Sequence, residues 1–466
     1  MNIDEYALDD DIAAIATALA PAALSVIRTS GKNSFEKFAS IFSRSQALLQ
    51  SDGHRLLYGW IVDGDKKLDE VVVCTYRSPK SFTGEDAIEV ICHGGLEVTY
   101  ALFSLILGAG FRQAKPGEFT FRSFVSGKSD LTKAEAIKEI IDAKSQHVVA
   151  HAASHLSGSL FESITAIKSL LLRSIAEISV TIEYPEDEIQ DEPTIQIAPF
   201  MEVKGLLSGL IQYWEQERIF ADGAKVVLAG ATNAGKSKLF NTLVHQERSI
   251  VSEIEGTTRD WIDADMQIKG IPITLYDTAG LRFTNEKIES IGIHRTHELT
   301  KTSDLLLYLV DSTKGISESD IQFLESKDAG QLNMILIFTK QDLLDEDKAQ
   351  KLLENFSQKA YCRNPLFISA QTGVGIDKLI DAMYSLLIKN PLDVENLTVG
   401  TLRQKLAVEN ALLFVDKAIT NAGNGMPVDT IVLDLEEALH SLGELTGEIT
   451  SDDILGEVFL HFCVGK

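Results

Sequence analysis

Apolar and polar positions alternate in short runs along residues 1–124. The runs Ala23–Arg28, Val71–Tyr76 and Ala87–Cys92 have the length of strands, and Tyr100–Leu107 has the apolar spacing of a helix. Glycines separate these runs. The pattern predicts a compact α/β domain over residues 1–124.

The pattern becomes helical over residues 125–220. Residues 131–183 contain no proline and a single glycine, Gly158. Their apolar residues recur at helical spacing, which predicts long helices: Ala134, Ile137, Ile140 and Ile141, then Ile164, Ile167, Leu170 and Leu171. The acidic, proline-bounded Tyr184–Pro193 interrupts the pattern, and a further single helix is expected from Ile197 to Phe220.

Regular α/β alternation follows over residues 221–389. Near-continuous apolar runs of this kind mark strands that are buried on both faces of a parallel sheet: Val226–Ala229, Ile273–Tyr276, Leu305–Val310, Met334–Phe338 and Leu366–Ile368. Residues 390–466 are helical again. This order predicts one helical domain, made of 125–220 and 390–466, with the α/β domain inserted into it. Two separate helical units are the alternative.

Composition limits the classes of partner. Of 466 residues, 45% are hydrophobic and 24% are charged, as in a globular protein with a sizeable core. The formal net charge is −25. Since nucleic-acid binding usually needs a basic face, we expect any RNA contact to be weak or shared with a partner.

The cysteines and the N-terminus favour a cytoplasmic protein. The four cysteines are scattered without a CxxC pair, which disfavours a disulfide framework or a zinc site and favours a reducing compartment. The acidic N-terminus lacks the basic start and apolar run of a signal peptide. No stretch approaches the roughly 18 apolar residues of a membrane span, so we expect no membrane segment.

Gly230–Ser237 has the sequence GATNAGKS and matches the phosphate-binding pattern GxxxxGK[ST]. It lies between a predicted strand, Lys225–Ala229, and a predicted helix, Lys238–Val244. Backbone N–H groups of this P-loop and the helix N-terminus would surround phosphates. Lys236 would reach the β- and γ-phosphates, and Ser237 would bind Mg²⁺. A glycine-rich turn is the alternative.

Two further segments would complete the phosphate site. Asp277–Gly280 (DTAG) ends a predicted strand, so Asp277 can hold Mg²⁺ through water and the Gly280 N–H can meet the γ-phosphate. Gly256–Asp260 lies between this segment and the P-loop, and its Thr258 is the expected Mg²⁺-binding threonine. Taken alone, the first could be an ordinary turn and the second a polar loop.

Thr339–Asp342 (TKQD) follows a predicted strand, at the position where guanine-binding proteins carry an NKxD sequence. Asp342 can accept hydrogen bonds from N1–H and N2–H₂ of guanine, and adenine cannot donate there. Thr339 replaces the asparagine and removes an amide, and Ser369-Ala370 would complete the base pocket. The sequence therefore predicts a GTP site. An ATPase is the alternative, and Asp342 is the feature against it.

Leu281 follows the DTAG sequence in the switch where Ras-type GTPases carry a glutamine that orients the attacking water. Another group must therefore assist hydrolysis. Asn233 offers one, because its amide oxygen could help bind a monovalent cation beside the phosphates. Such a cation would take the place of an arginine finger.

Together these motifs resemble those of the MnmE (TrmE) family of tRNA-modification GTPases, over essentially the whole chain. The most specific sequences lie outside the nucleotide site: Lys80–Asp86 (KSFTGED), His93–Gly95 (HGG), Pro116–Phe119 (PGEF), Thr450–Asp453 (TSDD) and Cys463–Lys466 (CVGK). The resemblance implies an N-terminal tetrahydrofolate-binding and dimerisation domain over 1–124. It also implies a helical domain in two parts, 125–220 and 390–466, and an inserted Ras-like P-loop GTPase domain over 221–389.

The resemblance implies an activity as well. The family's GTP hydrolysis depends on K⁺ and accompanies dimerisation of the GTPase domains. The homodimer works as a heterotetramer with the FAD-dependent partner MnmG. It adds a carboxymethylaminomethyl-type group to C5 of the wobble uridine, position 34, of certain tRNAs. A 5-formyl- or methylene-tetrahydrofolate is the one-carbon donor or its stand-in.

Site residues follow from the resemblance position by position. Folate contacts fall on Arg28, Glu89, Lys128 and Lys466, K⁺ contacts on Asn233, Ser252, Ile254 and Thr257, and Mg²⁺ contacts on Ser237 and Thr258. Glu289 would position the attacking water and act with Lys236 and Asn233 in catalysis. The expected GTP-binding residues are Asn233, Ala234, Gly235, Lys236, Ser237, Lys238, Ser252, Glu253, Ile254, Glu255, Gly256, Thr257, Thr258, Asp277, Thr278, Ala279, Gly280, Thr339, Lys340, Asp342, Ser369, Ala370 and Gln371.

The residues themselves leave other interpretations open. Arg28 could be a surface arginine, Lys128 a loop lysine and Glu289 a solvated helix glutamate. Glu89 could contact a ligand or point outward from its strand. Cys463 could be a thiol nucleophile, but we interpret it as buried or structural because no His–acid pair is evident beside it.

Two other functions compete with tRNA modification. An RNA-binding GTPase of the ribosome-assembly or translation type would need a basic appendage, and the tail 390–466 is not markedly basic. A folate enzyme acting alone, with a merely regulatory GTPase domain, is the third possibility.

Overall fold

The computed structural model describes residues 8–183, 195–246, 262–277, 303–325, 333–344, 365–388, 397–460 and 462–465. The chain divides into two compact units. The first unit comprises Met1–Ile141, Ala153–Ser208 and Thr401–Lys466, and the second comprises Asp142–Ala152 and Gly209–Gly400. None of the helices in the described ranges is both long enough and apolar enough to cross a bilayer.

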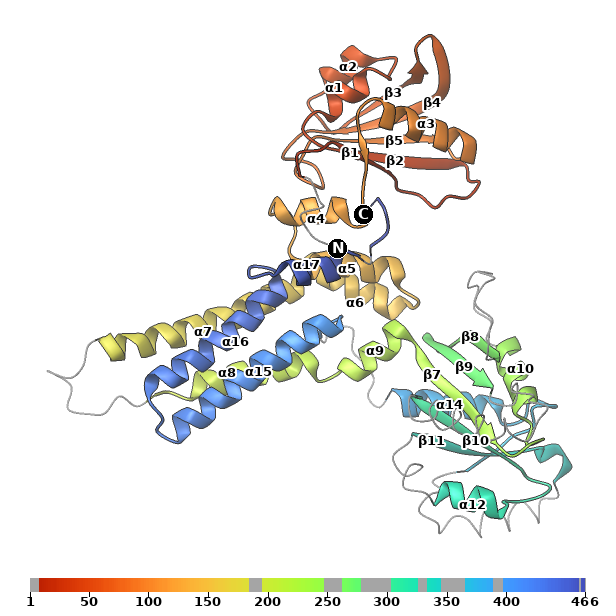
Figure 1. The fold of residues 1–466 in the computed structure, drawn as a ribbon. Helices are drawn as coiled ribbons and strands as arrows, with labels where there is room; N and C mark the ends of the chain where they lie inside the picture. Colours follow the sequence, from red (N-terminus) through yellow and green to blue (C-terminus); the bar gives the residue numbers. More distant parts are fainter. Residues whose placement is uncertain are drawn as a thin grey trace, which may run out of the picture. The chain divides into compact units, whose positions relative to one another are not determined.

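A six-stranded sheet forms the N-terminal part of the first unit (Figure 1). Its order is β3-β4-β5-β2-β1-β6, and neighbouring strands are antiparallel except β1 and β6. The strands are β1 Ile12–Ile15, β2 Leu24–Ser30, β3 Arg55–Asp63, β4 Lys66–Tyr76, β5 Ala87–His93 and β6 Arg112–Gln113. Helices α1 (Ser34–Ala39), α2 (Ser45–Leu49) and α3 (Leu96–Gly108) share one apolar core with the inward-facing strand residues. The mixed α/β prediction is confirmed here, although the sequence did not predict β1, β3 and the short β6.

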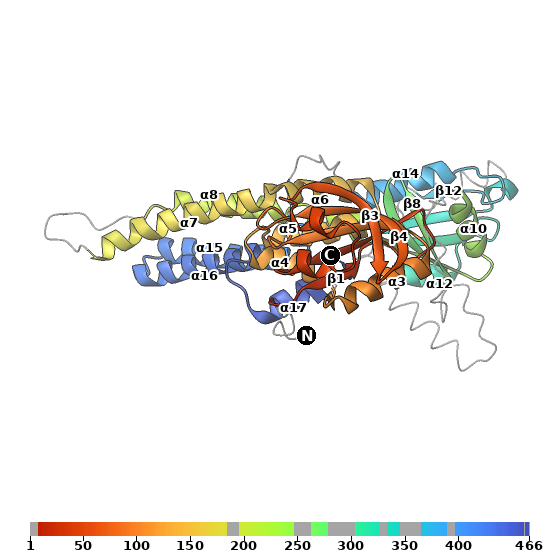
Figure 2. The same cartoon turned by 90° about the horizontal axis from the view of Figure 1, so that it is seen from above.

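Helices make up the rest of the first unit. They are α4 Glu118–Val125, α5 Leu131–Asp142, α7 Ser159–Glu183, α8 Ala198–Ile211, α15 Leu402–Gly423, α16 Val428–Thr446 and α17 Asp452–Leu460, of which α5 and α8 have their last residues in the second unit. Helix α6, Gln146–Ser157, spans the division between the units. Helix α15 packs along α16, and α16 packs on α7. Figures 1 and 2 both show α7, α8, α15 and α16 side by side.

Ion pairs also connect helices that are far apart in the sequence. Lys204 on α8 lies 2.7 Å from Asp416 on α15, and Arg403 on α15 lies 2.7 Å from the buried Glu135 on α5. Helices that precede and follow residues 221–389 therefore pack together within the first unit. This packing agrees with an inserted α/β block, and the boundaries at 124, 220 and 389 stay predictions.

The expectation of one helix from Ile197 to Phe220 is wrong. The chain forms α8 and then α9, Trp214–Asp222, because Tyr213 leaves the helical region at φ −107° and ψ 11°. The amides of Gln216 and Glu217 donate to the Tyr213 carbonyl and begin the new helix. The break lets α9 bury Trp214, Ile219 and Phe220.

The second unit is built on a six-stranded sheet in the order β12-β11-β10-β7-β9-β8. The strands are β7 Ala224–Gly230, β8 Ile262–Ile268, β9 Ile271–Asp277, β10 Leu305–Asp311, β11 Met334–Thr339 and β12 Leu366–Phe367. Helices α9, α10 (Lys236–Gln246) and α14 (Ile376–Leu387) contribute to one core, and α12 (Glu318–Leu324) contributes to the core on the opposite face.

The expected strands form a parallel sheet, and burial on both faces is confirmed for β10 and for most of β7 and β11, whereas β9 alternates between buried and half-buried residues and β12 is half-buried. All of them pair in parallel, and β10 is buried at every position. Strand β8 was not predicted, and it pairs antiparallel with β9. Its alternating sequence IDADMQI is that of an edge strand and contains no continuous apolar run.

A buried charge network includes residues from two of the sequences that carry the resemblance. Arg122 on α4 is almost completely buried, and it donates to Glu85 of KSFTGED at 3.0 Å and to Glu118 of PGEF at 3.1 Å. Arg112 lies 2.6 Å from the same Glu118, which is fully buried. The network therefore ties the loop before β5 to the start of α4.

Replacing Arg122 with methionine should destabilise the protein by about 3–5 kcal/mol, because the buried Glu118 carboxylate and the half-buried Glu85 carboxylate would each lose a donor. Urea unfolding of the full chain, followed by far-UV circular dichroism, measures the loss. The matched control is Arg55→Met, whose ion pair with Asp52 is exposed, so its unfolding midpoint should stay close to that of the wild type. Equal unfolding midpoints for the two variants would contradict the structural role.

Candidate functional site

The P-loop follows β7 and leads into α10, as the sequence predicts. Gly230 ends the strand with φ +134°, and a Cβ there would lie 2.1 Å from the Leu309 carbonyl oxygen, so only glycine fits against β10. Asn233 and Gly235 have φ +65° and +94°. Left-handed residues of this kind turn backbone N–H groups toward one side of a loop, where an anion can be bound.

Lys236 points its ammonium group into this loop. The side chain is buried, and Nζ donates to the carbonyls of Gly230 at 2.7 Å and Ala231 at 2.9 Å. Burial lowers the pKa of Lys236, while the charge of Asp277 raises it. A buried ammonium beside inward-facing amides favours an anion, and Asp277 at the end of β9 can balance a cation that accompanies a phosphate. These residues fit a Mg²⁺-bound triphosphate.

The predicted base-binding residues lie on neighbouring loops of the second unit. Strand β11 ends at Thr339, and Asp342 follows as an exposed residue that receives a 2.6 Å hydrogen bond from Ser369 Oγ. Lys340, at φ +59°, pairs with Asp311 at 2.6 Å. The P-loop and the base loop thus both lie at the carboxyl edge of a parallel sheet, which is where α/β sheets bind ligands.

The structure brings many of the expected GTP-binding residues to this edge: Asn233, Ala234, Gly235, Lys236, Ser237, Lys238, Asp277, Thr339, Lys340, Asp342, Ser369, Ala370 and Gln371. Lys238 Nζ donates to Gln371 Oε1 at 2.8 Å, which joins α10 to the loop after β12. The remaining nucleotide and cation residues lie outside the described ranges: Ser252, Glu253, Ile254, Glu255, Gly256, Thr257, Thr258, Thr278, Ala279, Gly280 and Glu289. Their roles stay predictions.

Asp311 lies at the same edge of the sheet, and the sequence analysis did not predict it as a site residue. It ends the apolar run of β10 just as Asp277 ends that of β9, and this strand-end position was the available signal. Its carboxylate also accepts from the Thr313 amide at 3.0 Å. The Lys340 ammonium and the Thr313 hydrogen bonds lower the pKa of Asp311, although burial acts in the opposite direction as the largest single effect.

The predicted folate residues lie on the first unit. Arg28 on β2 stands opposite Glu89 on β5, and the two side chains form a half-buried ion pair at 2.8 Å. Arg28 also donates to the Gly465 carbonyl at 3.2 Å, so the C-terminal residues reach this face of the sheet. Lys128 is exposed in the loop after α4, and Lys466 lies outside the described ranges. Arg28 is therefore not a plain surface arginine, and its ligand role stays a prediction.

The interpretation of Cys463 as buried is wrong. Its side chain is exposed, whereas the neighbouring Phe462 is buried against the ring of Phe459. Phe462 takes the inward position, and Val464 bridges to Pro116 beyond it, so Cys463 faces outward between them. In the described residues, Cys74 and Cys92 are the other free thiols, and burial raises the pKa of each.

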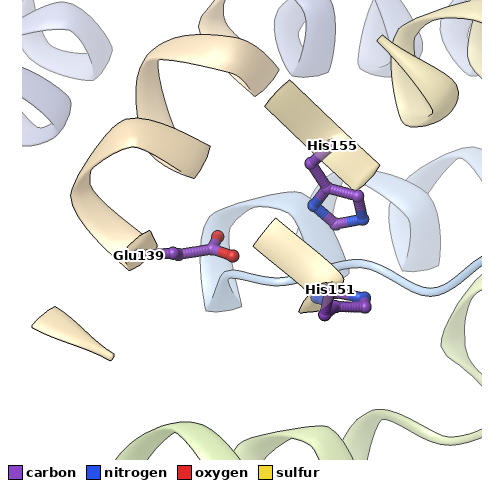
Figure 3. Close-up of side chains that lie close together, drawn as sticks. All are labelled: Glu139, His151 and His155. Carbon is purple, nitrogen blue, oxygen red and sulfur yellow. The ribbon is translucent and has the colours of Figure 1, made fainter. Parts of the chain in front are cut away.

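Figure 3 shows Glu139 on α5 with His151 and His155, which lie one turn apart on α6. His155 is fully buried, and His151 Nε2 lies 2.8 Å from Thr398 Oγ1. All three residues make further interactions within the chain. Because His151 belongs to the second unit and the others to the first, neither unit alone supplies three metal ligands. We assign no metal to them.

His151 should make folding depend on pH. Burial, aided by His147, lowers its pKa below the ordinary 6.5 despite the opposing charge of Glu217. The unfolded chain therefore takes up this proton at higher pH than the folded chain. The stability that the neutral His151 contributes to the folded state is fully present above about pH 6.5. It is lost as the pH falls toward the folded-state pKa, and the free energy of unfolding decreases by at most about 1.4 kcal/mol per pH unit.

Thermal unfolding between pH 7.5 and 5.5 checks this expectation. His151→Gln should lose part of the acid destabilisation seen in the wild type, whereas His245→Gln, at an exposed position on α10, should keep all of it. An identical pH dependence in all three proteins would contradict the assignment.

Comparison with known proteins extends over the whole chain. Residues 131–463 match the model of the MnmE helical domain, and residues 11–128 match the model of the GTP-binding protein TrmE N-terminus. The chain is 46% identical over 476 residues to the tRNA modification GTPase MnmE of Treponema denticola, and this alignment covers 100% of both proteins. It is 39% identical over 462 residues to the MnmE of Borrelia recurrentis, with 98% of both covered.

Among solved structures, the chain is similar to Era of Aquifex aeolicus bound to GDP and AlF4−. That match has 22% identity and a TM-score of 0.31, and it covers 41% of this chain and 67% of that one. The family assignment rests on the full-length sequence relatives. The chain belongs to the MnmE family of tRNA modification GTPases.

Proposed function

We propose that this protein hydrolyses GTP and, with an FAD-dependent MnmG partner, adds a carboxymethylaminomethyl-type group to C5 of the wobble uridine of certain tRNAs. The observation that carries the GTPase part is the carboxyl edge of the second sheet, where Lys236 and Asp342 lie on neighbouring loops. The tRNA part rests on family membership over the full length of the chain.

The P-loop supplies the binding of the phosphates. Amides of Asn233–Lys236 donate to phosphate oxygens, and the Lys236 ammonium exchanges its two carbonyl partners for the β- and γ-phosphates. The hydroxyl of Ser237, with Thr258, would hold Mg²⁺, and Asp277 would act through a water. When bound, Mg²⁺ offsets the negative charge of the β- and γ-phosphates.

Hydrolysis needs two further groups. Asn233 has a left-handed backbone and an exposed side chain beside the P-loop, which supports a role in holding K⁺ together with Ser252, Ile254 and Thr257. The K⁺ would offset charge that develops on the phosphates in the transition state. Glu289 would orient the attacking water. We propose that the GTPase domains dimerise when GTP is hydrolysed.

A 5-formyl- or methylene-tetrahydrofolate would bind the first unit at Arg28, Glu89, Lys128 and Lys466. The half-buried pair of Arg28 and Glu89, next to the Gly465 carbonyl, supports this proposal. The Glu89 carboxylate can accept hydrogen bonds from the N–H groups of a pterin ring, while the ion pair with Arg28 holds that carboxylate in place. The protein would act as a homodimer, in a heterotetramer with MnmG, and a tRNA substrate favours a cytoplasmic location.

Mass spectrometry of tRNA nucleosides from a strain lacking the gene tests this function. The carboxymethylaminomethyl-type wobble nucleosides should disappear, and a wild-type copy should restore them. A copy with Lys236→Ala should not restore them, whereas one with Lys269→Gln, at the exposed β8–β9 turn, should do so. Unchanged nucleosides in the deletion strain would contradict the tRNA assignment. Full restoration by Lys236→Ala would contradict a GTP-driven reaction.

A further inference from the structure

Thr339 occupies the first position of the base-reading sequence, where an asparagine is usual. It is the last residue of β11, and its side chain is 3% exposed. Its hydroxyl lies 2.7 Å from the Ala234 carbonyl of the P-loop and 3.2 Å from the Val310 carbonyl at the end of β10. Both acceptors are backbone oxygens, so the threonine hydroxyl must be the donor.

The geometry determines what this hydroxyl can do for a nucleotide. A threonine has a single O–H, and here it is committed to two backbone acceptors at once. The rest of the side chain lies against Gly235, where a Cβ would come within 3.6 Å of it. The residue is thus enclosed by the P-loop on one side and β10 on the other. It has no further donor for the base.

Guanine carries an acceptor at N7, to which an asparagine amide could donate, whereas the O–H of Thr339 is already used by two backbone carbonyls. The other contacts of the base loop are directed elsewhere, because Lys340 pairs with Asp311 and Asp342 is held by Ser369. The carboxylate of Asp342 can only accept hydrogen bonds, so it serves N1–H and N2–H₂ and not N7.

We propose that Thr339 is a positioning residue that couples the base loop to the phosphate loop through Ala234, and that position 339 makes no hydrogen bond to N7 of the base. Guanine selectivity in this chain then depends on Asp342, while Thr339 sets the shape of the P-loop for any nucleotide. This inference rests on the proposed GTP site.

Nucleotide binding by the purified full chain tests the proposal with fluorescent GDP and unlabelled competitors. For the wild type, GTP and 7-deaza-GTP, which lacks the N7 acceptor, should compete equally well. Thr339→Val keeps the shape of the side chain but removes the hydroxyl. It should weaken the binding of GTP and of 7-deaza-GTP by the same factor, about tenfold. Thr339→Ser keeps the hydroxyl and should bind both like the wild type.

Thr339→Asn supplies the missing amide and should be the one variant that prefers GTP over 7-deaza-GTP. A wild type that already prefers GTP over 7-deaza-GTP would overturn the proposal, as would a Thr339→Val protein that binds GTP as tightly as the wild type. These outcomes differ from failure of the GTP site itself. In that case the wild type would bind none of the guanine nucleotides.

Discussion

Replacing Lys236 with alanine should abolish GTP hydrolysis and leave the chain folded. The ammonium group is buried against the Gly230 and Ala231 carbonyls, and phosphates bound in the loop would add to the charge of Asp277 in balancing it. Its loss removes a charge that stabilises the phosphoryl transition state, and we expect kcat to fall by at least about a thousandfold. Folding should not suffer, because burial already penalises the charged form of this lysine.

Phosphate release at saturating GTP measures the effect, and thermal unfolding shows that the variant is folded. Lys269→Gln is the matched control, because it removes an exposed lysine from the turn between β8 and β9, at the opposite edge of the same sheet. Its rate should equal that of the wild type. A Lys236→Ala protein that retains a tenth or more of the wild-type rate would contradict the phosphate-binding role.

Replacing Asp342 with asparagine should change which base the protein prefers. The carboxylate is exposed at the carboxyl edge of the sheet and is held at one oxygen by Ser369. Loss of two charge-assisted hydrogen bonds to guanine should weaken GTP binding roughly a hundredfold to ten-thousandfold. Xanthine has a carbonyl in place of the guanine amino group, so the new amide can donate to it and XTP binding should improve.

Competition binding with GTP and XTP measures the switch. Ser369→Ala is the informative comparison, since it removes the hydroxyl that holds Asp342 but leaves the carboxylate in place. This variant should bind GTP about tenfold more weakly than the wild type and should still prefer GTP over XTP. An Asp342→Asn protein that still prefers GTP over XTP would show that another group reads the base.

The position of the P-loop between a strand and a helix, and the parallel strands themselves, could be predicted because they depend on local sequence. The P-loop needs only Gly230, Gly235 and their neighbours, since left-handed glycines and a following helix are local features. The apolar runs of the second sheet are local features too, because a strand that is buried on both faces consists of consecutive apolar residues.

Contacts between distant residues account for what the sequence could not show. Thr339 contacts Ala234 at a separation of 105 positions, and Arg122 contacts Glu85 at a separation of 37, so no local spacing pattern links either pair. The exposure of Cys463 depends on which neighbour packs against Phe459, and this is Phe462. Strand β8 was not predicted, because its apolar residues alternate with polar ones and the other strands of this sheet were predicted from continuous apolar runs.

Nucleotide hydrolysis by the purified full chain, with Mg²⁺ and K⁺ present, is the most direct measurement of the central claim. Initial rates of phosphate release with GTP and with ATP, at equal concentration, should show turnover of GTP and none of ATP above the Lys236→Ala background. Equal turnover of the two nucleotides, a preference for ATP, or no turnover of either would contradict a guanine-specific site built from the P-loop and Asp342.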